Sequence, residues 1–170
     1  KRNGEFTVNI AVVRDGVPVL GVIYVPVSGE LYVGTAGEGA VKAMYPADGA
    51  PDAQKAMEGA TSIPVAKADR PYTAVASRSH MSAETEEFIA ELRKEHGDVA
   101  LISKGSSLKL CMVAEGKADC YPRFAPTMEW DTAAGQAICM AAGFDVTDQN
   151  TGETMRYNRE DLLNAWFLVK

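Results

Sequence analysis

The chain has 170 residues, of which 46% are hydrophobic and 24% charged, and its formal net charge is −6. These fractions are typical of a globular protein and exclude global disorder. The negative charge argues against a broad surface for a nucleic acid polymer or an anionic membrane. No stretch reaches the roughly 20 apolar residues that a transmembrane helix needs. A small phosphorylated ligand stays compatible with this composition, because a few local cations can bind an anion inside an acidic protein.

The first residues alternate between two faces, which is the periodicity of a β-strand. The apolar residues on one face are Phe6, Val8, Ile10 and Val12. Thr7 and Asn9 lie on the opposite face. An Arg-Asp-Gly turn signal then leads into a second apolar, β-branched run. With further short strands expected over residues 31–35 and 40–43, residues 1–45 are predicted to form an antiparallel meander.

Residues 46–70 are rich in Pro, Gly, Ala and Asp at their start and show no sustained period, so we expect a loop or linker there. Beyond it, strands and helices alternate, which predicts an α/β domain over residues 71–170. Strands are expected near residues 72–77, 98–103, 118–121, 144–146 and 166–169, and helices over 82–96, 107–115 and 131–142. The predicted fold is therefore α/β in the broad (α+β) sense, an antiparallel meander followed by an α/β domain with a mixed sheet.

The three cysteines, Cys111, Cys120 and Cys139, are an odd number without CxxC spacing. They indicate neither a disulfide framework nor a zinc site. We expect buried thiols in a reducing cytoplasm, with association at the inner face of the membrane left open. The sequence opens with KRNGEF, which has no initiator Met and no apolar signal core, so we expect a chain cut from a longer protein.

A first candidate site is the segment from Gly105 to Lys109, between a predicted strand and a predicted helix. Free backbone N–H groups at a helix start, the hydroxyls of Ser106 and Ser107 and an ammonium group suit a phosphate. The structural alternative is a serine that caps the helix beside a solvated surface lysine. The spacing does not match a P-loop.

A second candidate is Asp131, at the start of an Ala-rich helix. A carboxylate held at the positive end of a helix suits Mg²⁺, which prefers hard oxygen ligands. The alternative is an ordinary N-cap aspartate. The neighbouring Trp130 is expected to anchor the core.

Two single residues complete the candidates. His80 follows a predicted strand at its carboxyl end, where open α/β sheets bind ligands, and could hydrogen-bond a base or a phosphate. Arg123 could bind a phosphate bidentately. The alternatives are a partly exposed loop histidine and a structural arginine. Because Ser-His-Asp, HExxH and GxGxxG patterns are absent, phosphoryl chemistry suits this set better than acyl or hydride transfer. One carboxylate cannot hold two magnesium ions, which need several oxygen ligands.

These segments resemble a known family. The segment WDTAAG, residues 130–135, is similar to the W-D-x-A-A-G signature of the inositol monophosphatase superfamily. Within it, the segments KRNGEFTVNIAVV, SRSH, GSSLK and YPRF resemble the bacterial 3′(2′),5′-bisphosphate nucleotidases. The resemblance implies a layered α-β-α-β-α fold and removal of the 3′-phosphate from adenosine 3′,5′-bisphosphate, a step linked to sulfate assimilation. It also implies Mg²⁺ as cofactor and inhibition by Li⁺.

Carried over residue by residue, the resemblance implies that Asp131 ligates metal and contacts substrate. It implies that Ser106, Lys109, Arg123 and His80 hold the nucleotide. The family's other metal ligands, including a D-P-x-D-G-T motif, precede the segment that resembles KRNGEF. We therefore expect residues 1–45 to complete the sheet of a missing N-terminal half, and the chain alone to be catalytically incomplete.

Three alternatives stay open at this point. The substrate could be an inositol phosphate or a fructose bisphosphate instead of a nucleotide. The chain could also be a non-catalytic nucleotide-binding domain. Homo-oligomerisation is neither indicated nor excluded.

Overall fold

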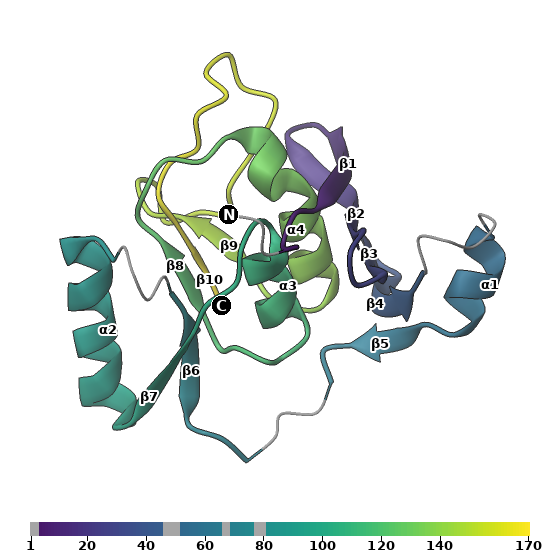
Figure 1. Cartoon of the computed structure of the whole chain (residues 1–170). Coiled ribbons are helices and arrows are strands. Elements are labelled where there is room, and N and C mark those ends of the chain that lie inside the picture. The colour runs from purple at the N-terminus through teal and green to yellow at the C-terminus, as the bar shows by residue number, and fades with distance from the viewer. Residues whose placement is uncertain (1–3, 46–51, 66–68, 77–80) are drawn as a thin grey trace.

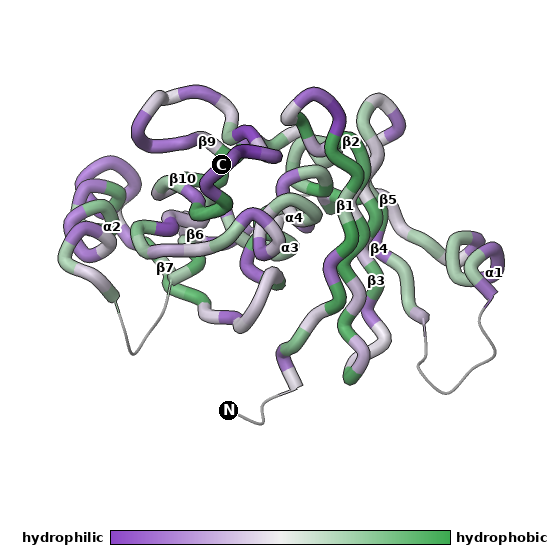
Figure 2. The backbone as a smooth tube through the Cα atoms, turned by 90° about the horizontal axis from the view of Figure 1, so that it is seen from above, coloured by the Kyte–Doolittle hydropathy of each residue, from purple (hydrophilic) through white to green (hydrophobic). Residues whose placement is uncertain are grey.

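The computed structural model describes residues 4–45, 52–65, 69–76 and 81–170. Within this part, a five-stranded sheet covers one side of the helix pair α3 and α4, and two small sheets with helix α2 lie on the other side (Figures 1 and 2). The layers therefore alternate β, α, β, α, with the larger core between the five-stranded sheet and the central helices. This arrangement confirms the expected α+β class.

The predicted meander is present as strands β1 (Val8–Arg14), β2 (Val17–Val25), β3 (Glu30–Thr35) and β4 (Gly39–Met44). They pair antiparallel in the order β1-β2-β3-β4-β5. Asp15 and Gly16 make the first turn with φ of 51° and 77°, the left-handed values that a tight hairpin requires at these positions. Since each strand pairs with its sequence neighbour, local hairpins build the sheet.

The stretch 46–70 departs from the expected loop, because its described part contains a helix and a strand. Helix α1 (Ala53–Glu58) is capped by Asp52, and β5 (Thr61–Ile63) pairs with β4 as an edge strand. Helix α1 buries none of its residues. It therefore leaves no apolar period in the sequence by which a helix could be recognised.

Helix α4 (Glu129–Ala141) lies directly on the five-stranded sheet because both surfaces are built from small residues. A Cβ on Gly21 would lie 2.2 Å from the Ala134 carbonyl oxygen, and one on Gly34 would lie 2.5 Å from the Cα of Ile138. These paired glycines of β2 and β3 therefore allow helix and strand backbones to approach closely.

The second half of the chain contains two small sheets. Strands β6 (Tyr72–Val75) and β7 (Val99–Ile102) are parallel and are connected by α2 (Ala83–His96), with Ser82 as its N-cap. The other sheet is antiparallel and consists of β8 (Tyr121–Arg123), β10 (Phe167–Val169) and β9 (Val146–Asp148). A parallel bridge between Ala74 and Cys120 joins the two sheets. The sheet region is therefore mixed, as expected.

Helix α3 (Leu108–Ala114) is fixed at its carboxyl end by a buried charge cluster around Glu115. The Tyr32 hydroxyl donates to this carboxylate, and the Nζ of Lys42 lies 3.3 Å from it. Lys117 adds an ion pair of 2.5 Å. Burial and the Glu115 carboxylate both raise the pKa of Tyr32 well above its ordinary value. The cluster connects the carboxyl end of α3 to β3 and β4.

All three cysteines are free and buried, which confirms the expectation of buried thiols. In the part of the chain that the structure describes, no helix is long and apolar enough to cross a membrane.

Candidate functional site

A cavity of about 400 Å³ opens where β1, α3, β8 and α4 meet. Its lining includes four of the five residues singled out in the sequence, namely Ser106, Lys109, Arg123 and Asp131. The fifth, His80, lies outside the described residues. Residues from three separate segments, the outermost of them Ser106 and Asp131, thus contribute to one polar site.

Lys109 and Arg123 form a cationic wall of this cavity. Burial and the nearby Arg123 charge both lower the pKa of Lys109, in that order of importance. The Lys109 Nζ donates to the Ser106 carbonyl at 3.1 Å and lies 5.8 Å from the centre of the Tyr121 ring. Lys109 is therefore partly buried, whereas the structural alternative described a solvated surface lysine. An anion bound beside Lys109 and Arg123 would offset the repulsion that Lys109 experiences.

Arg123 is only partly satisfied by the protein. Its Nη2 donates to the Pro126 carbonyl at 3.1 Å. Its Nε is buried and has no hydrogen-bond partner among the described residues. Because Arg123 lines the polar cavity, its guanidinium group is suited to an oxyanion ligand there.

The start of α3 differs from the open phosphate site expected there. The Gly105 N–H donates to the Glu5 carboxylate at 2.9 Å, so a side chain of the protein already binds this group. Ser107 occupies the N-cap position but makes no side-chain cap. Its hydroxyl instead donates to the Asp131 carbonyl at 3.0 Å. Anion binding at this site therefore depends on side chains more than on the helix end.

Asp131 lies in the first turn of α4, two residues after the helix begins at Glu129. One carboxylate oxygen accepts the Met128 N–H at 2.9 Å, so Asp131 caps the helix start from the third helical position, and the N-cap residue itself is Met128. Asp131 also lines the cavity, which keeps it available as a ligand residue. Within the described residues, no group of three or more His, Cys, Asp or Glu side chains could hold a metal ion.

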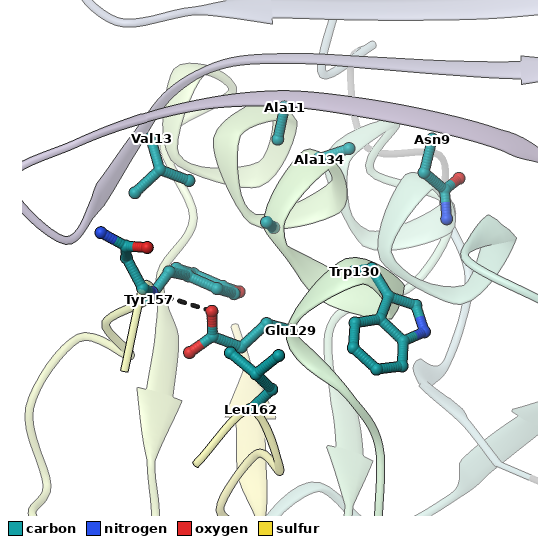
Figure 3. Close-up of a pocket in the computed structure, with 10 residues that line it drawn as sticks. Asn9, Ala11, Val13, Glu129, Trp130, Ala134, Tyr157 and Leu162 are labelled. Carbon is teal, nitrogen blue, oxygen red and sulfur yellow. Dashed lines mark hydrogen bonds between the residues drawn. The ribbon is translucent and has the colours of Figure 1, made fainter. Parts of the chain in front are cut away.

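The expectation that Trp130 anchors the core was wrong. Its side chain is 60% exposed and lines both the polar cavity and an adjoining one of about 310 Å³ (Figure 3). The buried core under this part of α4 is formed by small residues such as Ala133 and Ala134, which line the adjoining cavity together with Trp130.

A buried polar network under α4 was missed in the sequence. Gln136 is fully buried, and its Oε1 accepts the Tyr157 hydroxyl at 2.8 Å. The Asn164 Nδ2 donates to the Thr132 Oγ1 at 2.9 Å. Glu129 accepts from the backbone and side chain of Arg159. These bonds connect α4 to residues 157–164. In the sequence, the signal for this network was the presence of two polar residues, Thr132 and Gln136, on the apolar side of the predicted helix.

Thr7 and Asn9 also line the polar cavity, although the sequence suggested no role for either. Asn9 projects from the side of β1 that faces α4, together with Ala11 and Val13 (Figure 3), and Thr7 comes directly before the strand. The apolar stripe on the other side is exposed, with Phe6 at 56% and Ile10 at 57%.

The comparisons with known proteins agree with this architecture. The model of the inositol monophosphatase family matches residues 1–167. The chain therefore belongs to the inositol monophosphatase family.

Among its relatives are bacterial nucleotidases. The 3′(2′),5′-bisphosphate nucleotidase CysQ of Salmonella typhimurium is 46% identical over 99% of this chain, and that of Escherichia coli K12 is 45% identical. The crystal structure of CysQ from Bacteroides thetaiotaomicron superposes with a TM-score of 0.91 at 57% identity, covering 99% of this chain and 64% of that one. Staphylococcal IMPase-II, at 20% identity and a TM-score of 0.71, shares the fold. The chain spans 61% of the length of the two curated relatives.

Proposed function

We propose that this chain is the nucleotide-binding part of a Mg²⁺-dependent phosphatase that hydrolyses adenosine 3′,5′-bisphosphate to AMP and phosphate. The observation that carries the proposal is one cavity with two cations and a carboxylate, Lys109, Arg123 and Asp131. The names of the Salmonella and E. coli relatives supply the substrate class. Net negative charge elsewhere on the chain favours a small anion over a polymer.

The proposed roles follow from the chemistry of each group. Lys109 and Arg123 neutralise phosphate oxygens of the nucleotide, the arginine through its guanidinium group. Ser106 lies beside them in the cavity lining and can hydrogen-bond the same oxygens. His80 is proposed as a further nucleotide contact on the basis of the resemblance alone.

Asp131 is the residue of this chain that would hold Mg²⁺, because an ionised carboxylate near a helix start is a hard oxygen ligand. A Mg²⁺ ion bound there would supply Lewis-acid polarisation of the phosphoryl group and an acidified water molecule. A single carboxylate does not complete such a site. We propose that the other ligands come from the part of the relatives' length that this chain does not span.

The exposed side of β1 supports the proposal that the site is shared between this chain and the remaining part of the protein. Four apolar residues form a stripe there, each between 47% and 57% exposed, namely Phe6, Val8, Ile10 and Val12. β1 is also the edge strand of its sheet, so one row of its backbone groups is available for pairing. We propose that the remaining part of the protein covers this stripe and extends the sheet.

A second function is favoured by one observation. Since the described residues contain no cluster of three metal-ligating side chains, the chain alone would bind nucleotide without hydrolysing it. This reading concerns the isolated chain and is compatible with a nucleotidase as the full-length protein.

The proposal is tested by steady-state kinetics of the full-length protein with adenosine 3′,5′-bisphosphate and Mg²⁺. Lys109→Ala and Arg123→Ala are each expected to raise KM at least about tenfold, because a charge-assisted hydrogen bond contributes about 1.5–3 kcal/mol. Lys94→Ala, at a side chain 71% exposed on α2, is the matched control and should leave KM unchanged. Unchanged KM in both site variants, or melting of the protein with affinity retained, would show that these residues are structural.

A further inference from the structure

Asn9 of β1 begins a chain of two hydrogen bonds that connects three elements of the site. Its Nδ2 donates to the Ser107 Oγ at 2.8 Å across 98 positions of sequence. The Ser107 hydroxyl in turn donates to the Asp131 carbonyl at 3.0 Å. A relay therefore runs from β1 through the start of α3 to the first turn of α4.

The donor and acceptor count fixes the direction of this relay. A serine hydroxyl has one hydrogen, and the Ser107 hydrogen is used on the Asp131 carbonyl. The atom of Asn9 that faces Ser107 must then be a donor, which is the amide nitrogen. An aspartate, a valine or a leucine at position 9 could not make this bond.

The same arrangement leaves two oxygens unsatisfied. Asn9 Oδ1 and Thr7 Oγ1 are buried, and neither has a hydrogen-bond partner among the described residues. A buried acceptor that has lost water without gaining a partner destabilises the fold. Stability alone therefore does not account for the polar residue at position 9, where a β-branched apolar residue would suit the strand better.

We infer that Asn9 is a positioning residue, which holds Ser107 and through it fixes Asp131 relative to Lys109. The inference rests on the proposed function, since Asp131 and Lys109 are its ligand-binding groups. A displacement of the first turn of α4 would move the Asp131 carboxylate away from the metal while leaving the core beneath the helix intact. A loss of geometry of this kind lowers turnover more than it lowers stability.

The test uses the full-length protein and the variants Asn9→Val, Ser107→Ala and their combination. Each single change is expected to lower kcat about tenfold and to raise the Mg²⁺ concentration needed for half-maximal activity. The double variant should be no worse than the more affected single variant, because both changes break one relay. The melting temperature of Asn9→Val should equal or exceed that of the wild type, because the valine removes an unsatisfied buried acceptor.

Thr61→Val, which makes a similar polar-to-valine change at an exposed position of strand β5, is the control and should behave as the wild type. Wild-type kcat in Asn9→Val would overturn the inference, as would independent, multiplying losses in the double variant. A fall in activity matched by an equal fall in the folded fraction would also overturn it. If Asn9→Val does not fold, Ser107→Ala decides by the same metal titration. If the wild type prefers another phosphate monoester, the proposed substrate is wrong. The single and double variants are then compared on the preferred monoester instead.

Discussion

Gly34→Ala is expected to destabilise the protein by forcing α4 away from the sheet. The added Cβ would lie 2.5 Å from the Cα of Ile138 and 3.1 Å from the Ala137 carbonyl oxygen. Carbon atoms in ordinary contact lie about 3.5–4.0 Å apart, so strand and helix must separate by about 1 Å. The obstructing atoms belong to backbone, which cannot rotate away as a flexible side chain would.

The magnitude follows from two opposing contributions. Overpacking a well-packed core costs about 1–3 kcal/mol and occasionally more, and a backbone clash of this size belongs at the upper end. Alanine lowers the conformational entropy of the unfolded chain, which returns about 0.4–1 kcal/mol. The expected net loss in the free energy of unfolding is therefore about 2 kcal/mol.

Denaturant unfolding of the full-length protein measures this loss. Gly59→Ala is the matched control, because its added Cβ would have only one atom, the Ala56 carbonyl oxygen at 3.9 Å, among its contacts. The control should unfold at the same denaturant concentration or slightly higher. A Gly34→Ala protein within about 0.5 kcal/mol of the wild type would refute the close helix–sheet contact.

Three further predictions concern buried groups. Tyr157→Phe removes the donor to Gln136 and should lower the free energy of unfolding by about 1–2 kcal/mol in denaturant titrations, and no change would contradict the buried network. The three cysteines should resist a thiol reagent at mildly alkaline pH until the protein is unfolded. Burial raises the pKa of Cys120 to about 11 and also raises the pKa values of Cys111 and Cys139. Rapid labelling of the native protein would contradict this prediction. Burial raises the pKa of Tyr121 to about 12, above the unfolded value of about 10. The contribution of Tyr121 to the free energy of unfolding is therefore complete below about pH 10 and is lost as the pH rises toward about 12. Tyrosinate absorbance and unfolding measured together over that range check this, and a stability independent of pH there would contradict it.

Local patterns in the sequence were sufficient for the meander and for α2. Hairpin strands carry an alternating pattern and a turn signal, and α2 has Ser82 as its cap and Gly97, with φ of 76°, as its stop. These features are decided by residues that are close in sequence. Helix α1 was missed because it buries nothing and so has no pattern to detect.

The orientation of β1 could not be read in the same way. Alternation separates two faces of a strand but does not say which one packs against the protein. The polar face with Asn9 turned out to face α4 and the cavity, while the apolar face with Ile10 is exposed. Trp130 was misassigned for a similar reason, since an aromatic residue is assumed to be buried until the helix face beneath it is known.

The candidate site combined local and distant information. Lys109 and Asp131 were recognised from residue type and from their positions near predicted helix starts. Their meeting in one cavity depends on how α3 and α4 pack, which no local pattern encodes. The relay through Ser107 connects residues 24 and 98 positions apart and was invisible for that reason.

Whether this cavity serves a nucleotide phosphatase is tested most directly by phosphate release from the full-length protein. Adenosine 3′,5′-bisphosphate and inositol monophosphate are compared with and without Mg²⁺, for the wild type and Asp131→Asn. We expect Mg²⁺-dependent release with a clear preference for the nucleotide, and loss of that release in Asp131→Asn. A wide preference for inositol monophosphate, or turnover that persists without Asp131, would contradict the proposed function.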